Sequence, residues 1–477
     1  MPIAKALKRW RPAGGNAKKF VIAWGLLAGL AMLPLGERAG AAMAADQAPF
    51  SPGTELTLMR AIEISLRYHP RRREAQADVG AARERVGEAR AYLMPQVNGD
   101  AQYLRATDNG IDGTNYFSVP LLTRVPSNGP RNNQTHDTTN NYTLAMTAYQ
   151  HLLDFGRTRG FIDQRRFESA AQEAELRLVD LDLAFEVASR YFGLLSAAQI
   201  VKVYEEAIKQ RQFQVDEAKV KAAAGLKPEM DVYTARAELA HARVSLVDAN
   251  NGQANAKVAL DNAMGLDGDA PDYKLADSLS YGPIKEPLES YLKSATAHRP
   301  DLITLENQAR AAGAQVTEYR SDYFPTFGAT VGYNVRSQGL PMVNNFDVGL
   351  VITWPIFNGF LTTHEVGEAR MQQESIRHAI EDLEQRIYYQ VKSEFLDWQA
   401  SLQRIARAAE ALDASRAELE LGEKRYQVGL GSIIELTDAQ RQFTQDDAEY
   451  INARYAFAVA QATVERDSAC CLPEVQR

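Results

Sequence analysis

The chain has 477 residues, of which 45% are hydrophobic and 24% charged, and its formal net charge at pH 7 is −8. This length allows several domains, and the acidic balance argues against a DNA- or RNA-binding protein. The two cysteines of the sequence, Cys470 and Cys471, are adjacent and lie near the C-terminus. Their spacing fits neither a zinc site nor a thioredoxin-like motif, and they cannot join distant segments.

The first 45 residues have the pattern of an export signal. Basic residues between positions 5 and 19 precede an apolar stretch from Phe20 to Leu35, and small residues follow around Ala42 and Ala44. The apolar stretch is shorter than the about 20 residues of a membrane-spanning helix, so we expect residues 1–45 to be a cleaved signal peptide; an uncleaved anchor is the alternative. Cleavage removes seven Lys/Arg and one Glu, which changes the net charge from −8 to −14.

The rest of the sequence contains one unit twice. At an offset of 230 residues, Ala61–Pro70 resembles Tyr291–Pro300, and Tyr92–Pro95 resembles Asp322–Pro325. Farther along, the offset falls to 204 and stays constant. It then pairs Asp154 with Asn358, Val187 with Val391, Tyr191 with Phe395, Gly225 with Gly429, Asp231 with Glu435 and Ala235 with Ala439. This pattern predicts a first repeat over 46–265, a linker or equatorial segment over 266–286, a second repeat over 287–469 and a tail over 470–477.

Each repeat opens with a helical pattern that a proline interrupts, at Pro70 and at Pro300, because proline lacks the N–H group that a helix needs. Pro95 and Pro325 then end a helix and open a pair of strands in which apolar and polar residues alternate. The predicted strands cover about 96–105, 141–150, 326–336 and 345–354. Strands of about 10 residues have the length that crosses an outer membrane when tilted.

The surroundings of these strands favour a membrane location. Four aromatic residues near strand ends would form an aromatic girdle: Tyr103, Tyr142, Tyr333 and Trp354. The connecting segments 106–139 and 337–345 are polar, and the first is the longer one, so we expect both to be loops outside the cell. The alternative is a half-buried sheet of a soluble domain, whose strands also alternate. Since the sequence after the signal has no run of 18 apolar residues, strands and not helices would enter the membrane.

The strand pairs are followed by very long helical patterns. Residues 157–223 and 361–427 would each form a helix about 100 Å long at 1.5 Å per residue, and helices of this length need coiled-coil partners. Gly225 and Gly429 are then expected to turn the chain into returning helices that end near Met264 and Ala469. Four strands cannot close an outer-membrane barrel, which needs at least 8. Two, three or four chains would supply 8, 12 or 16 strands.

This duplicated order resembles the TolC-like family of outer-membrane efflux and secretion channels over roughly residues 50–470. The resemblance rests on the helix–proline–strand junctions, on Leu153–Gly156 with its counterpart Phe357–Gly359, and on the glycine turns. It implies an α+β membrane protein, a homotrimer with a 12-stranded β-barrel in outer-membrane lipid and a long periplasmic α-helical barrel. It also implies a passive exit duct of a tripartite efflux or type I secretion system, which works with a periplasmic adaptor and an inner-membrane transporter.

The resemblance also points to site residues at the periplasmic helix tips. By position, Glu435 and Asp438 correspond to the carboxylates around the narrowest part of the family's pore, and their i, i+3 spacing places them on one helix face. Tyr426 and Asp231 match positions that hold the closed state, whereas the family's basic partner falls on Gly431. The segments that resemble adaptor-docking tips are Gly225–Leu226 and Val428–Gly429–Leu430.

These tip residues also have simpler interpretations. Ser432 followed by Glu435 has the spacing of a capping box, which requires no channel. The two glycine turns equally suit ordinary helix C-caps with a hydrophobic contact. We expect Glu435 to be either a cap or a pore-lining residue, or both, and Asp438 to line the pore.

Other functions find little support in the sequence. Asp154–Phe155–Gly156 spells a kinase magnesium motif, but no catalytic-loop or glycine-rich-loop pattern accompanies it. The seven histidines lack paired metal-ligand spacing, and neither a phosphate loop nor a nucleophile elbow is present. We therefore expect no enzyme activity, catalytic residue, metal or cofactor. The alternative to a channel is a periplasmic coiled-coil adaptor or scaffold outside the membrane, which would explain the helices but not the strand pairs.

Overall fold

The computed structural model describes residues 53–107, 138–266, 268, 272–278, 286–337 and 343–469. The chain divides into two units, the first of which ends at Thr54, and the second unit is described here. The predicted signal peptide, most of the two loops that join the strands, and the Cys470–Cys471 pair lie outside the described residues.

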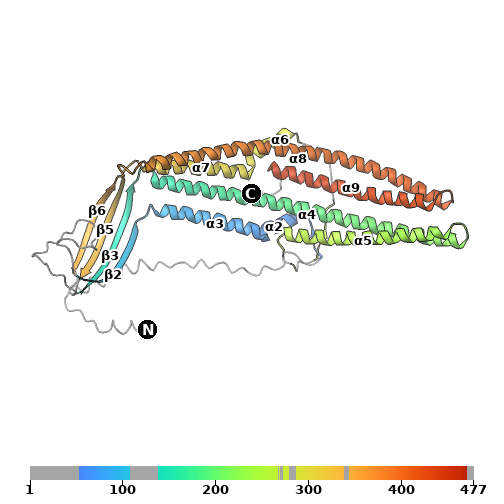
Figure 1. Cartoon of the computed structure of the whole chain (residues 1–477), viewed down its shortest axis with the longest axis horizontal. Coiled ribbons are helices and arrows are strands. Elements are labelled where there is room, and N and C mark those ends of the chain that lie inside the picture. The colour runs from blue at the N-terminus through green and yellow to red at the C-terminus, as the bar shows by residue number, and fades with distance from the viewer. Residues whose placement is uncertain are drawn as a thin grey trace, which may run out of the picture. The chain divides into compact units, whose positions relative to one another are not determined.

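The second unit contains the same series of elements twice (Figure 1). The first series is α2 (Leu58–Tyr68), α3 (Pro70–Ala91), β2 (Gln96–Thr107), β3 (Thr138–Leu153), α4 (Arg157–Ala223) and α5 (Glu229–Ala263). The second is α6 (Leu288–His298), α7 (Pro300–Ser321), β5 (Thr326–Ser337), β6 (Val343–Thr353), α8 (Leu361–Gln427) and α9 (Ile433–Asp467). Helices α4 and α8 have 67 residues each, and α5 and α9 have 35 each. The internal duplication of the sequence is therefore a duplication of structure.

The element boundaries follow from local chemistry. Pro70 and Pro300 occupy the first positions of α3 and α7, where the missing N–H group costs no helical hydrogen bond. Before α4 the carboxylate of Asp154 accepts hydrogen bonds from the backbone N–H groups of Gly156 (3.1 Å) and Thr158 (2.6 Å). Gly156 itself has a φ of +104°, which glycine adopts without strain. Asp154 thus starts the long helix, which gives the Asp-Phe-Gly sequence a structural role.

The four long strands form one antiparallel sheet in the order β2-β3-β5-β6. Its register places apolar residues of all four strands in one row on one face. One such row consists of Val97, Ala148, Val331 and Val348. The neighbouring row, on the opposite face, consists of Asn98, Thr147, Gly332 and Asp347. The sheet is therefore apolar on one face and polar on the other, as the alternation in the sequence predicts.

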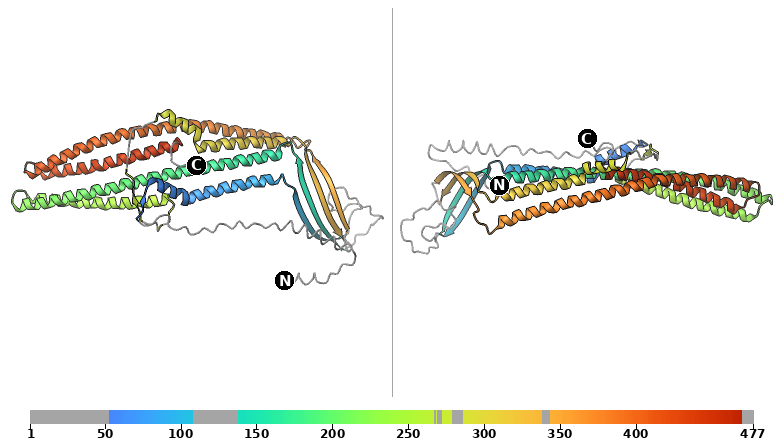
Figure 2. Two further views of the ribbon diagram at one scale, coloured as in Figure 1. Left: turned by 180° about the vertical axis from the view of Figure 1, so that it is seen from behind. Right: turned by 90° about the horizontal axis from the view of Figure 1, so that it is seen from above.

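The long helices cover one another along their length. Helix α4 packs against α3 and α7 near the sheet and against α5 near the other end, while α8 packs against α7 and then α9 (Figures 1 and 2). Contacts between α4 and α9 join the two halves. A buried cluster around Ile387, Val391, Trp398 and Phe457 forms the core of the second half. This packing supplies the apolar burial that a 67-residue helix lacks on its own.

A short two-stranded sheet joins segments that are far apart in the sequence. Strands β1 (Glu55–Leu56) and β4 (Lys274–Leu275) pair in parallel, so the segment predicted as a linker or equatorial segment contains a short strand. The fully buried Tyr191 of α4 donates its hydroxyl proton toward Leu56 O (2.8 Å) and Asp277 Oδ2 (2.7 Å). The same carboxylate oxygen accepts the N–H group of Leu58 at 2.7 Å. The start of the unit and the connection between repeats are thus fixed to the middle of α4.

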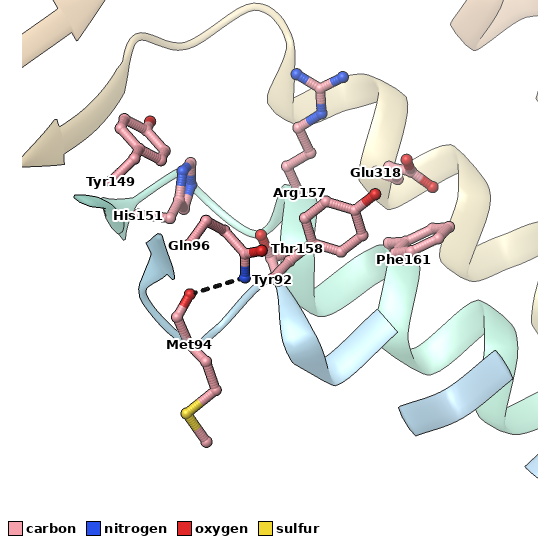
Figure 3. A pocket seen from close by; sticks show the side chains of 9 residues that line it. All are labelled: Tyr92, Met94, Gln96, Tyr149, His151, Arg157, Thr158, Phe161 and Glu318. Atoms are coloured by element: carbon pink, nitrogen blue, oxygen red, sulfur yellow. Dashed lines mark hydrogen bonds between the residues drawn. The ribbon is translucent and has the colours of Figure 1, made fainter. Parts of the chain in front are cut away.

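The helices meet the sheet around a pocket of about 480 Å³. Figure 3 shows Tyr92 and Phe161 beside Arg157 and Glu318 where β2 and β3 join α3 and α4; the rings of Tyr92 and Phe161 pack edge to face with centroids 5.9 Å apart. Helices α4 and α7 touch at Gly160, where a Cβ atom would lie 2.8 Å from the Glu318 nitrogen and 3.0 Å from the Ala314 oxygen. These backbone atoms cannot move away independently of α7.

We predict that Gly160→Ala separates α4 from α7 and lowers the free energy of unfolding by about 1–3 kcal/mol, the usual cost of overpacking. Gly367→Ala is the matched control, because a Cβ atom at this position of α8 meets no atom within 4 Å. In a helix this control change should stabilise by about 0.5–1 kcal/mol. Thermal denaturation followed by circular dichroism in detergent would compare the two. Equal melting temperatures for both variants would contradict the prediction.

Candidate functional site

The turns that join α4 to α5 and α8 to α9 lie at the same end of the helices, away from the sheet (Figures 1 and 2). Both turns close with the same pair of hydrogen bonds. In the first, the N–H groups of Gly225 and Leu226 donate to Ala222 O and Lys221 O, at 2.9 Å each. In the second, Gly429 and Leu430 donate to Tyr426 O (3.2 Å) and Arg425 O (2.9 Å). Both glycines have positive φ, at +74° and +83°. These are glycine C-caps of the Schellman type.

Tyr426 and Asp231 lie together at this end, although 195 residues separate them in the sequence. The Tyr426 hydroxyl donates to Asp231 Oδ2 over 3.5 Å, which is a long hydrogen bond. Tyr426 is completely buried and Asp231 nearly so. Burial raises the pKa of Tyr426 to about 12, and the carboxylates of Asp231 and Glu217 raise it as well. The phenol therefore stays protonated at physiological pH and remains a hydrogen-bond donor.

Two lysines of the first half, Lys221 and Lys227, lie against the ring of Tyr426. Their Nζ atoms lie 4.6 Å (Lys221) and 5.1 Å (Lys227) from the centroid of the ring, within cation–π range. Lys221 Nζ also donates to the backbone oxygens of Tyr426 (3.1 Å) and Gln427 (3.3 Å), and Lys227 Nζ donates to Gly431 O (3.1 Å). Neither lysine was predicted from the sequence. For Lys227 the repeat register contained a signal, because the offset of 204 pairs Lys227 with Gly431.

Gly431 lies close to the end of α8. A Cβ atom at this position would lie 3.1 Å from Tyr426 N and 3.2 Å from the Arg425 carbonyl carbon. Such contacts are tighter than ordinary van der Waals packing, so a side chain here would push the turn outward. Glycine at position 431 therefore lets the backbone of the turn lie close to the end of α8, where the side chain of a basic residue would be crowded.

Glu435 and Asp438 are exposed in the protomer, and each carboxylate has an arginine partner. Glu435 Oε1 lies 2.9 Å from Arg425 Nε, and Asp438 Oδ1 lies 3.0 Å from Arg441. Their side chains are 45% and 60% exposed. The Glu435 N–H group donates to Ser432 Oγ at 3.1 Å. Ser432 is therefore the N-cap of α9. The Glu435 carboxylate pairs with Arg425 and lies on the exposed face of the helix.

A polar cleft of about 280 Å³ lies between α4, α8 and α9 just above the turns. Gln214, Glu217, Glu423 and Gln440 are among its lining residues. Burial raises the pKa of Glu423, and the carboxylates of Glu217 and Glu420 raise it further. Among the described residues, the buried amide of Gln214 has no hydrogen-bond partner. The two halves are thus incompletely bonded here, in contrast to the region around Tyr426.

The proposed docking turns carry exposed apolar side chains. Leu226, Val428 and Leu430 are each at least 70% exposed. Met230 and Ile434, in the first turns of α5 and α9, are also exposed. The predicted site residues are therefore gathered at one end of the helices, in two groups: a buried group around Tyr426 and an exposed group at and beside the turns.

Two repeats, each built from a strand pair and long helical hairpins, define the class of protein to which this chain belongs. The outer membrane efflux protein family matches residues 61–266 and 291–466, and the chain belongs to this TolC-like family of outer-membrane proteins. No helix in the described part of the chain is long and apolar enough to cross a membrane.

Named relatives cover most of the chain. It is 23% identical to the outer membrane protein TolC of Escherichia coli (strain K12) over 425 residues, which is 86% of this chain and 81% of the relative. It is 27% identical to the protein CyaE of Bordetella pertussis over 397 residues, or 81% and 78% of the two chains.

Solved structures share the fold. The structure of CusC matches with a TM-score of 0.73 and 21% identity, over 89% of this chain and 98% of CusC. The Campylobacter jejuni CmeC outer membrane channel matches with a TM-score of 0.72 and 16% identity, over 86% and 85% of the two chains.

We predict that Ser432→Ala destabilises the first turn of α9 by about 1 kcal/mol, because the Glu435 N–H group loses its capping oxygen. Hydrogen exchange at the Glu435 amide should then be faster. Ser415→Ala is the control, since the Ser415 hydroxyl donates to Leu412 O within α8 and caps no helix. The prediction fails if Ser432→Ala leaves the exchange at Glu435 as slow as the control does.

Proposed function

We propose that this chain is one protomer of a homotrimeric duct that conducts substrates across the outer membrane from an inner-membrane pump and its periplasmic adaptor. The observation that carries the proposal is the continuity of an amphipathic four-stranded sheet with two 67-residue helices. In three copies the strands would form a 12-stranded barrel and the helices would extend it as a periplasmic tube. Substrates would pass through passively, and the helix tips would gate the periplasmic end.

The surface of the sheet supports the proposal that it forms a lipid-facing barrel wall. On β6, the residues Phe346, Val348, Leu350 and Ile352 all point to the apolar face and are more than 60% exposed. Water would disfavour such a stripe, whereas lipid would favour it. The opposite face carries Asn98, Asp100 and Asp347, which suit an aqueous lumen.

The sheet also has two edges that other chains can complete. Strands β2 and β6 are the edges in the protomer, and a sheet edge in lipid leaves unpaired backbone groups at a cost of several kcal/mol each. Pairing β6 of one protomer with β2 of the next removes all edges when three copies close the ring. The exposed apolar residues of α5, among them Val244, Val247 and Val258, suggest that neighbouring helices cover this helix in the same assembly.

The tips are proposed as the gate. Three copies of the Glu435 and Asp438 pair would bring six carboxylates to the narrowest part of the tube, where they would attract cations in competition with their partners Arg425 and Arg441. The buried Tyr426–Asp231 contact joins the α8–α9 hairpin to the α4–α5 hairpin and would hold the closed state. The exposed apolar residues Leu226, Val428 and Leu430 would form the docking surface for the adaptor.

A periplasmic scaffold outside the membrane is the competing function. It explains the helices, but it leaves the exposed apolar stripe of β6 in water. Membrane flotation of the mature protein separates the two: a chain that stays soluble without detergent would rule out the duct, and a chain that floats with the outer-membrane fraction would rule out the scaffold.

For the gate, we predict that Glu435→Gln with Asp438→Asn lowers the cation preference of single channels in planar bilayers and weakens block by polyvalent cations. Glu449→Gln is the control, because Glu449 lies about three turns from Asp438 on the same face of α9 and away from the tip. If the double variant keeps the selectivity and block of the wild type, these carboxylates do not line the constriction.

A further inference from the structure

The two repeats differ at one position of the tip in a way that concerns the gate. Their register pairs Lys227, in the α4–α5 turn, with Gly431, in the α8–α9 turn. The second half thus has glycine where the first half has a base. The Nζ atom of Lys227 donates to the backbone oxygen of this same Gly431. A positive charge is therefore present beside Tyr426, but it comes from the other half of the protomer.

Lys221 makes a second connection from α4 to the end of α8. Its ammonium group has three acceptors, namely Glu217 Oε1 at 2.8 Å and the backbone oxygens of Tyr426 and Gln427. An ammonium group has three protons, so this set can satisfy it completely. The side chain is only 18% exposed, unlike a lysine that extends into solvent.

Two of the three acceptors are backbone carbonyls that favour a cation. Tyr426 and Gln427 are the last residues of α8, and the final carbonyls of a helix lack partners within the helix. They also form the negative end of the helix dipole. Lys221 therefore bonds the C-terminus of α8 from outside the helix. A sequence pattern cannot predict these hydrogen bonds, because their acceptors are backbone atoms.

We propose that Lys221 and Lys227 form a clasp within each protomer that holds the tip closed, with both ammonium groups within cation–π range of the Tyr426 ring. The proposal rests on the proposed function as a gated duct. The clasp bonds the α4–α5 hairpin to the α8–α9 hairpin of one protomer, whereas a base at position 431 would lie on the α8–α9 hairpin itself. Opening the tip then requires the lysines of that protomer to leave the three carbonyls.

The test is the open fraction of single channels of the mature trimer in planar bilayers. Lys221→Met and Lys227→Met keep the length of the side chain and remove the charge. Because charged hydrogen bonds are strong, each of these two variants should raise the open fraction about tenfold. Lys227→Arg should keep the open fraction close to that of the wild type, since a guanidinium group can donate to the same carbonyl oxygen.

Two lysines of the same region are matched controls. Lys219 pairs with Asp216 on α4, and Lys424 pairs with Glu420 on α8, so each bonds its own helix only. Lys219→Met and Lys424→Met should keep the open fraction of the wild type. Trimer assembly is checked on unheated gels, and Lys227→Met decides alone if Lys221→Met does not assemble.

The outcomes separate the clasp from the duct. A rise with the clasp variants, but not with the controls, supports the clasp. If the clasp variants keep the open fraction of the controls in a conducting protein, the clasp is wrong and the duct remains. If the wild type does not conduct at all, the proposed function fails, and the clasp fails with it.

Discussion

A helix of 67 residues is stable only where other helices bury it along its length, and this constraint shapes the whole protein. Near the sheet α4 is covered by α3 and α7, and toward the tip by α5 and α9. The change of partners occurs near Tyr191, where the β1–β4 pair and Asp277 are bonded to α4. This short sheet therefore lies at the point along α4 where the partners α3 and α7 end and the partners α5 and α9 begin.

Duplication gives two copies of each element, but the copies need not keep the same chemistry. At the tip, Asp231 is buried and contacts Tyr426, while its counterpart Glu435 is exposed and pairs with Arg425. Lys221 corresponds to Arg425 in the repeat register and makes contacts to the opposite hairpin, whereas Arg425 bonds within its own hairpin. The first half thus supplies the charges that bind the second half, and the second half presents carboxylates outward.

Much of this fold could be predicted from periodicity alone. The long helical patterns over 157–223 and 361–427 coincide with α4 and α8, because apolar residues in steps of three and four without a proline leave few alternatives over this length. The strand β3 runs from Thr138 to Leu153, beyond the predicted 141–150, since pairing with two neighbours extends a strand past its alternating core. The turns at Gly225 and Gly429 could be predicted from the sequence because a positive φ favours glycine.

The remaining features depend on contacts between distant residues. Strands β1 and β4 have two residues each, too few to show a period. Lys221 and Lys227 bond backbone oxygens, which every residue carries, so no sequence motif marks their partners. The Arg425–Glu435 pair likewise forms only after the turn brings the start of α9 beside the end of α8. Tertiary geometry, and not local propensity, creates these parts of the site.

The two edges of the sheet have a consequence for biogenesis. In the trimer proposed above, β2 and β6 find partners only in other copies, so a lone protomer cannot satisfy its backbone in lipid. The exported chain would then carry two open strand edges and the apolar stripe of β6 through an aqueous compartment, which is a recognised aggregation hazard. Insertion and association would have to occur as one concentration-dependent event, and the cell would need to keep the lone chain from pairing with the wrong edge until then.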